Sequence, residues 1–374
     1  MRFIATDRIP GLLGRLVESG MSVWAPQVVK DTVNTVLFAS WTGLEEISLD
    51  AYTMLSAKQL VLPATERLFS YRYTLKGGRE RIGIEPSPPA DKETAVFGAR
   101  ACDARALAAL DALFLPEEGS GYRDPGYAAH RAGLTVITLA CTTCDSACFC
   151  SSFGKGPAET AGSDLILYPV EGGLLAEPVT EKGSQIAAFD IFEDSEQSKP
   201  ELATTACIDL EGIGDKFLGA FNDLDFWQRA TENCLSCGYC TYACPACHCF
   251  NIFDEMSSDR EGERCRSWDA CMFYVYTLET SGHNPRPSIA HRYRNRVGHK
   301  FSYYPANQGE LLCTGCGRCI RNCPGGLDVR NVLKGLAAVE AATEPGTRKP
   351  GPSGPEAGKP GTEGPSANGP EAAR

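Results

Sequence analysis

The 374-residue sequence has no run of 18 or more apolar residues, and its net charge of −11 leaves no excess of basic side chains. The first absence argues against a membrane-spanning helix. The second argues against a nucleic-acid partner, because phosphate binding requires a basic face. The first twenty residues also lack the apolar stretch and small-residue cleavage site of a signal peptide. We therefore expect a cytoplasmic protein with no membrane span and no nucleic acid.

Signatures of nucleotide binding and of acid–base catalysis are also missing. No G-x-G-x-x-G follows an expected strand and no P-loop occurs, which argues against a dinucleotide or nucleotide phosphate bound by these routes. No Ser/His/Asp arrangement or carboxylate pair stands out, so no catalytic residue is assigned. Cysteine, in contrast, is abundant, with 18 residues. In a reducing compartment that number indicates metal binding rather than disulfides.

The first part of the chain, 1–225, has the pattern of an α/β or α+β domain. Residues 103–114 have Ala and Leu at helical spacing, with Asp103 as the expected N-cap. This helix lies between two of the expected strands, and a strand–helix–strand order predicts a partly parallel sheet. The β-rich runs that predict strands are 35–40, 94–98, 134–140 and 165–170.

Two further parts follow. Residues 226–342 are expected to form a mainly α-helical, ferredoxin-like domain, preceded by a helical stretch at 213–229. Residues 343–374 are rich in Pro and Gly and have almost no large apolar side chain. Such a segment cannot bury a core, so we expect it to be disordered.

Two copies of the pattern Cys-x2-Cys-x2-Cys-x3-Cys-Pro lie in the second part. In two-cluster ferredoxins, the fourth cysteine of each run ligates the other cluster. By this rule, cluster I takes Cys234, Cys237, Cys240 and Cys323, and cluster II takes Cys313, Cys316, Cys319 and Cys244.

Zinc is the alternative for these cysteines, since Cys-x2-Cys pairs also build zinc ribbons. A zinc site needs two such pairs, however, and calls for neither the third cysteine nor the final proline. We therefore predict two [4Fe–4S] clusters. The 68 residues from 245 to 312, which separate the motifs, are expected to form a helical insert.

The other ten cysteines leave one or two more clusters open. One set consists of Cys247, Cys249, Cys265 and Cys271, for which buried structural thiols are the alternative. The other set is Cys102, Cys141, Cys148 and Cys150, with Cys144 as a spare. Its members follow two expected strands of a parallel sheet, whose C-terminal ends meet at one ligand-binding edge. Structural thiols remain the alternative here too. Cys207 is expected to be an ordinary buried residue.

A basic segment, 283–300, stands out in this acidic chain. Cations near a cluster stabilise its reduced form and raise its potential. The alternatives are a solvated face that pairs with Asp and Glu, and a docking surface for an acidic partner. Its basic residues are Arg286, Arg292, Arg294, Arg296 and Lys300.

Taken together, these motifs resemble the iron–sulfur β subunits of soluble sulfhydrogenases and the related iron–sulfur subunits of anaerobic sulfite reductase. The resemblance covers about residues 60 to 335. Beyond the ferredoxin motifs it rests on GARACD at 98–103, CFCSSFGKGP at 148–157, RSWDACMF at 266–273, HNPR at 283–286 and RYRNRVGHK at 292–300. Two departures are Ala101, where the family usually has proline, and the extra Cys144.

The resemblance implies a non-catalytic role in electron transfer within a larger complex. A flavin-bearing reductase subunit exchanges hydride with NAD(P)H, and single electrons pass through this chain to or from a catalytic partner. That partner is expected to be a NiFe hydrogenase. A sulfite reductase, or a heterodisulfide-reductase-linked assembly, is the alternative. A different class of function is a disulfide or sulfur reductase acting at the N-terminal cysteines, which would require a cluster with an open coordination position.

Overall fold

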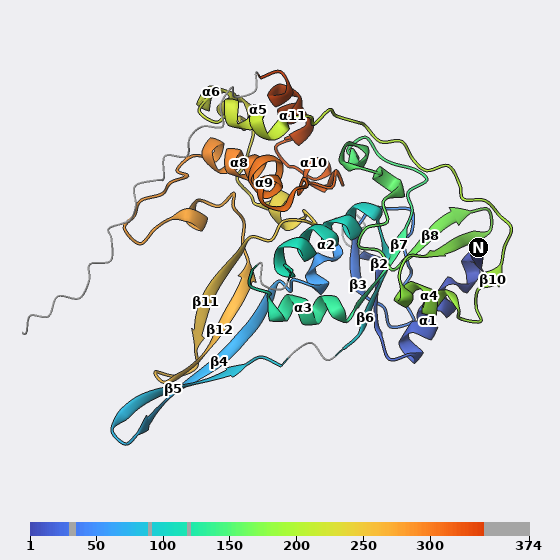
Figure 1. Cartoon of the computed structure of the whole chain (residues 1–374), viewed down its shortest axis with the longest axis horizontal. Helices are drawn as coiled ribbons and strands as arrows, with labels where there is room; N and C mark the ends of the chain where they lie inside the picture. The colour runs from blue at the N-terminus through green and yellow to red at the C-terminus, as the bar shows by residue number, and fades with distance from the viewer. Residues whose placement is uncertain (30–34, 89–91, 118–120, 340–374) are drawn as a thin grey trace, which may run out of the picture. The chain divides into compact units, whose positions relative to one another are not determined.

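The computed structural model describes residues 1–29, 35–88, 92–117 and 121–339, and these residues form one compact unit. The segment 343–374, expected to be disordered, lies outside the described residues. Strands from both sides of residue 225 share one sheet (Figure 1). The domain boundary near that residue stays a prediction. In the described ranges, no helix is long and apolar enough to cross a membrane.

An eight-stranded sheet runs in the order β10-β1-β9-β8-β7-β6-β2-β3. Strands β2, β6, β7 and β8 are parallel, and the outer pairings are antiparallel. The four predicted strands and the partly parallel sheet are therefore confirmed. The strands are β1 (Arg2–Ala5), β2 (Ser22–Val29), β3 (Thr35–Ser40), β6 (Thr94–Ala99), β7 (Leu134–Leu139), β8 (Leu165–Val170), β9 (Gly173–Pro178) and β10 (Glu193–Asp194).

Helices cover both faces of this sheet. Neighbouring residues of a strand point to opposite faces, so adjacent residues of β6 pack against different helices. Phe97 in β6 packs with α1 (Ile9–Glu18) and α4 (Glu181–Ala187). Its neighbour Val96 packs with α2 (Ala101–Phe114) and α3 (Pro125–Ala132). The predicted helix is thus confirmed as α2, but its N-cap is Arg100. Asp103 is the third helical residue, and its carboxylate accepts a hydrogen bond from the Arg100 N–H at 3.3 Å.

A second sheet, in the order β11-β12-β4-β5, joins the N-terminal part to the insert. Strands β4 (Thr65–Lys76) and β5 (Arg79–Pro86) form one hairpin, and β11 (Phe250–Met256) and β12 (Glu261–Trp268) form the other. The central pairing is β4 with β12. The insert is therefore not mainly helical as expected, since its first half is a hairpin that completes this sheet.

The rest of the C-terminal part consists mostly of short helices. They share a core around the buried side chains of Phe217, Trp227, Phe301 and Leu333. The predicted helical stretch at 213–229 forms two helices rather than one. The helices are α5 (Ile213–Gly219), α6 (Leu224–Ala230), α7 (Tyr239–Tyr242), α8 (Ile289–Gly298), the π-helical turn η6 (His299–Tyr303), α9 (Tyr304–Gln308), α10 (Arg318–Arg321) and α11 (Val329–Ala337). Single 3₁₀ turns are η1 (Thr6–Arg8), η2 (Ala57–Leu60), η3 (Cys150–Phe153), η4 (Gly156–Ala158) and η5 (Tyr274–Thr277).

Candidate iron–sulfur site

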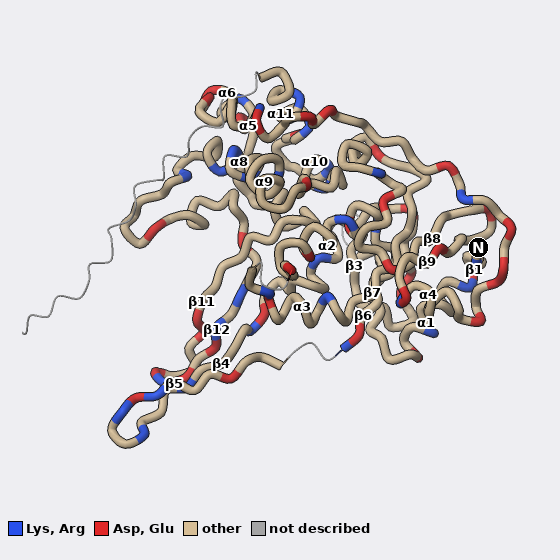
Figure 2. The backbone as a smooth tube through the Cα atoms, in the orientation of Figure 1, with Lys and Arg blue, Asp and Glu red and all other residues tan. Residues whose placement is uncertain are grey.

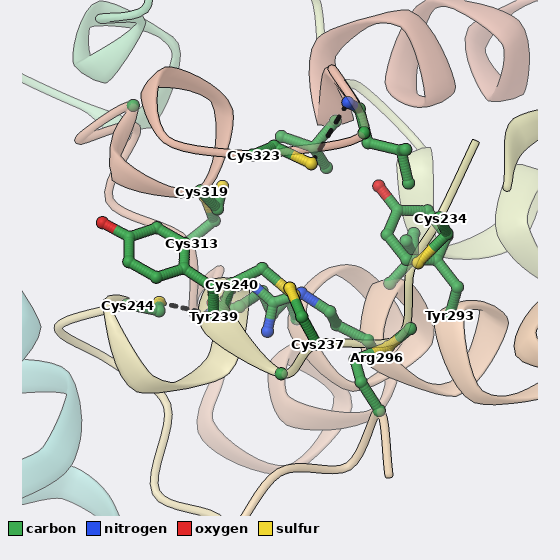
Figure 3. A pocket seen from close by; sticks show the side chains of 18 of the residues that line it. Cys234, Cys237, Tyr239, Cys240, Cys244, Tyr293, Arg296, Cys313, Cys319 and Cys323 are labelled. Atoms are coloured by element: carbon green, nitrogen blue, oxygen red, sulfur yellow. Dashed lines mark hydrogen bonds between the residues drawn. The ribbon is translucent and has the colours of Figure 1, made fainter. Parts of the chain in front are cut away.

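The eight cysteines of the two motifs line one cavity. Figure 3 labels all of them except Cys316, and the labelled side chains lie around a common centre. The space not filled by protein atoms is about 920 Å³, part of it open to solvent. The two motifs have the same local geometry. A glycine with positive φ, Gly238 or Gly317 (both 74°), precedes a one-turn helix, α7 or α10. Glycine takes this left-handed conformation without steric cost. The helix then carries the third cysteine of the motif, Cys240 or Cys319.

The fourth cysteine of each motif lies near cysteines of the other motif. Burial raises the pKa of Cys313, Cys316 and Cys319, and in each case the nearby Cys244 raises it further. Burial likewise raises the pKa of Cys234, and Cys323 adds to that rise. These are the neighbours that cross-ligation requires. Thiols of this kind lose their protons to a metal centre that supplies the missing positive charge, so the residues present fit two clusters.

Different donors face the sulfur atoms of the two cysteine sets. In the cluster I set, backbone amides donate to sulfur: Ser236 N to Cys234 Sγ at 3.4 Å and Leu327 N to Cys323 Sγ at 3.3 Å. In the cluster II set, the Lys300 ammonium donates to Cys244 Sγ at 3.2 Å. Cys237 is exposed, whereas Cys244 is buried. Cluster I would therefore lie nearer to the protein surface.

Much of the basic segment is buried. Basic residues lie along α8 (Figure 2). Three residues of the segment, Arg292, Arg296 and Lys300, are only 5%, 7% and 4% exposed. A solvated face is therefore wrong for these three residues. Arg296 donates from Nη1 to Cys247 Sγ at 3.1 Å and from Nη2 to the Cys240 carbonyl at 2.7 Å. Arg296 and Lys300 thus direct their positive charge at cysteines, whereas Arg292 and Arg294 donate to other residues.

The additional cysteines that follow the first motif are brought together only in part. A hydrogen bond from Cys249 lowers the pKa of Cys271 to about 6, despite burial. Cys247 lies beside Cys244, which raises the pKa of the Cys247 thiol. Cys265, in contrast, lies in β12 opposite Phe253 and Arg67, so it is a sheet residue rather than a fourth member of this group. Across the described ranges, no three His, Cys, Asp or Glu side chains could hold a single metal ion.

The N-terminal cysteine loop packs directly against the second ferredoxin motif. Phe149 N donates to the Gly315 carbonyl at 2.9 Å. A Cβ atom at Gly315 would lie 2.5 Å from Cys150 Cα, and one at Gly317 would lie 2.6 Å from the Ala147 carbonyl oxygen. These glycines therefore permit backbone contact between the loop and the motif.

This contact also brings the candidate cysteines of the N-terminal part near one another and near Cys316 of the second motif. Burial raises the pKa of Cys102, and both Cys316 and Cys141 raise it further. The pKa of Cys150 is raised to about 11, first by burial and then also by Cys141 and Cys316. Cys148 Sγ lies 3.3 Å from Asp145 Oδ1. Cys144 instead donates to the Thr204 carbonyl at 3.3 Å.

Several features of the site were not predicted. Cys207 is exposed rather than buried. Lys58, in the 3₁₀ turn η2 and outside any sequence motif, is buried and donates to the carbonyls of Thr241 and Cys247 at 3.2 and 3.0 Å. Arg318 forms a buried ion pair with Asp103, with Nη1–Oδ1 at 2.6 Å and Nη2–Oδ2 at 3.0 Å. The sequence carries no local signal for Lys58 or for the pairing of Asp103 with Arg318.

Residues 233–327 match the family model of the 4Fe-4S dicluster domain. The chain is therefore an iron–sulfur protein with two [4Fe–4S] clusters. Over 348 residues, it is 29% identical to sulfhydrogenase 2 subunit beta of Pyrococcus furiosus. The match covers 89% of this chain and 98% of that relative. The resemblance to sulfhydrogenase β subunits is thereby confirmed. No solved structure matches.

Proposed function

We propose that this chain is the electron-transfer subunit of a sulfhydrogenase-type complex. It would relay single electrons between a flavin subunit that reacts with NAD(P)H and a NiFe hydrogenase subunit. The observation that carries this proposal is the single cavity lined by all eight ferredoxin-motif cysteines. The identity to a sulfhydrogenase subunit supports the choice of partners. With all eighteen cysteines free, a reducing cytoplasm is the proposed location.

Within this proposal, the two clusters have different places in the relay. Cluster I, next to the exposed Cys237, would exchange electrons with a partner at the surface. Cluster II lies beside the loop that carries Cys150, on the side of the N-terminal sheet. Electrons would then pass between the surface and the N-terminal part through cluster I and cluster II in turn. Either direction of flow is compatible with this order.

The ligand sets follow from cross-ligation, and substitution of the fourth cysteine of each motif tests them. Cys244→Ser should change the spectrum of the cluster held by Cys313, Cys316 and Cys319, because Cys244 lies among these residues. Cys323→Ser should change the other cluster. Electron paramagnetic resonance (EPR) of the reduced full chain separates the two signals. If each substitution damages the cluster of its own motif instead, the assignment is wrong.

The proposed partners can be tested on the native complex. The tagged full chain, purified anaerobically from its own cells, should carry along both flavin and nickel in stoichiometric amounts. Sirohaem absorbance without nickel would instead favour the sulfite reductase alternative. A chain that purifies alone and reduces sulfur or a disulfide would overturn the relay proposal, because a relay subunit needs partners at both ends.

A further inference from the structure

Three buried basic side chains lie near Cys244, and two of them, Arg296 and Lys300, line the cavity. Lys58, Arg296 and Lys300 are 4%, 7% and 4% exposed. Among the described residues, none of them forms an ion pair with Asp or Glu. Their hydrogen bonds go to carbonyl oxygens and cysteine sulfurs, and Lys58 Nζ also lies 4.4 Å from the centre of the Trp268 ring. A buried charge without a counter-charge is strongly unfavourable. The negative charge that balances this trio must therefore come from cysteine thiolates and the clusters they bind.

Lys300 is the member of the trio that touches a sulfur atom of the proposed cluster ligands. Its Nζ donates to Cys244 Sγ at 3.2 Å. Lys300 lies in the π-helical turn η6, and such turns are frequently found at functional sites. A lysine ammonium is a compact positive charge with three N–H donors, and here one of these donors is directed at the Cys244 sulfur.

Among the described residues, no charged donor is hydrogen-bonded to a sulfur atom of the cluster I set, although Arg296 donates to the Cys240 carbonyl. Within the described part of the chain, the hydrogen bonds to Cys234 and Cys323 come from neutral backbone amides. Charge-assisted hydrogen bonds are roughly twice as strong as neutral ones. Because one-electron reduction makes a thiolate-bound cluster more negative, a fixed cation stabilises the reduced form more than the oxidised form.

We propose that Lys300 raises the reduction potential of cluster II relative to that of cluster I, and so makes cluster II the preferred location of an electron in the relay. Each cluster takes up one electron, and Lys300 keeps its proton in both states. This inference rests on the proposed ligand set, in which Cys244 belongs to cluster II. Of the interpretations of the basic segment, the first therefore applies to Lys300: its positive charge raises the reduction potential of a cluster.

The test uses the full chain, purified anaerobically with its clusters in place and reduced stepwise with dithionite. EPR-monitored titration gives the potential of each cluster. Lys300→Met should lower the potential of the cluster that Cys244→Ser perturbs, and should move the other potential less. Lys300→Arg should keep the potential near that of the wild type. Lys58→Met is a matched control, because Lys58 is equally buried but donates to carbonyls, and its effect should be smaller.

Lys300→Gln serves as a second variant because it retains N–H donors without charge. If the methionine variant loses iron, the cluster potentials of the glutamine variant show whether the charge of Lys300 raises the potential of cluster II. Unchanged potentials in a neutral variant with wild-type iron content would overturn the inference. A shift confined to the cluster that Cys323→Ser perturbs would overturn it as well. Failure of the ligand assignment is distinguishable, because Cys244→Ser would then leave the signal of the Cys313, Cys316 and Cys319 cluster unchanged.

Discussion

Arg318 and Lys300 show how differently two buried cations can act beside the same cysteines. Arg318 is 2% exposed, and both of its terminal nitrogens bond to the Asp103 carboxylate. Its charge is neutralised by this partner, which joins α10 of the second ferredoxin motif to α2 of the N-terminal part. Arg318 therefore acts as a structural link, whereas the charge of Lys300 is directed at sulfur.

Breaking the Arg318–Asp103 pair should destabilise the protein strongly. Arg318→Met leaves the buried Asp103 carboxylate without its partner, and the loss of one member of a buried pair costs about 3–5 kcal/mol. Anaerobic urea unfolding, followed by circular dichroism, measures this loss. Arg264→Met is the matched control. The Arg264–Asp254 pair is also bidentate, at 2.6 and 2.9 Å, but about 40% exposed, so its loss should cost less than ~1 kcal/mol. Equal effects in the two variants would contradict the structural role of Arg318.

Single residues were predictable where spacing carries the signal. The cysteine motifs are written in a local pattern, and the eight residues do meet at one cavity. Asp103 was predicted as a helix cap because its neighbours in the sequence are helical. Its actual partner, Arg318, is more than two hundred residues away. Local sequence patterns do not predict a contact between residues so far apart in the chain. The same is true of the hydrogen bonds from Lys58 to its two carbonyl acceptors.

At the scale of elements, the close contact between the loop 141–150 and the second motif depends on glycine. Gly317 has φ of +74° and precedes α10. Its Cα faces the Ala147 carbonyl so closely that a methyl group would be 2.6 Å from the oxygen. The obstacle is backbone rather than a flexible side chain, so the loop itself would have to move.

Gly317→Ala should therefore destabilise the protein and disturb cluster II. The left-handed conformation alone costs a non-glycine residue about 1–2 kcal/mol, and displacement of the loop adds to this. Gly309→Ala isolates the first contribution, since Gly309 has φ of +78° and no atom within 4 Å of the added Cβ. Urea unfolding and the EPR signal of cluster II measure the difference. If the two variants behave alike, the loop is not held by this contact.

Elements were predictable from sequence when their signal was local. The four predicted strands are short apolar runs in the middle or at the rim of the first sheet, and α2 has a helical pattern of Ala and Leu. The second sheet was missed. Its hairpin of β4 and β5 does carry a signal, with apolar residues at alternating positions before Gly77 and Gly78. The pairing of β4 with β12, however, links two distant segments, and no pattern within either strand identifies the other.

At the scale of the whole molecule, the N-terminal and C-terminal parts of the chain share one sheet and contact each other closely. The second sheet takes two strands from each half, and the N-terminal cysteine loop rests on the second ferredoxin motif. A fragment ending near residue 225 would lose both supports. Experiments on the N-terminal cysteines therefore need the full chain. The same arrangement places Cys102 and Cys150 near Cys316, so a third cluster there would extend the proposed relay beyond cluster II.

We predict that Cys102, Cys141, Cys148 and Cys150 hold this third [4Fe–4S] cluster. The full chain, reconstituted anaerobically, should then contain about twelve iron atoms, four for each of three clusters. Cys148→Ser should lower this number to about eight, with the two ferredoxin signals retained. Cys207→Ser is the control, because Cys207 is exposed and its Sγ contacts only the Ser151 carbonyl among the hydrogen bonds of the described residues, at 3.8 Å. A wild-type chain with about eight iron atoms, unchanged by Cys148→Ser, would show that these cysteines are structural. The relay would then end at cluster II, and the partner on that side would have to bring its own redox centre to the edge of the N-terminal sheet.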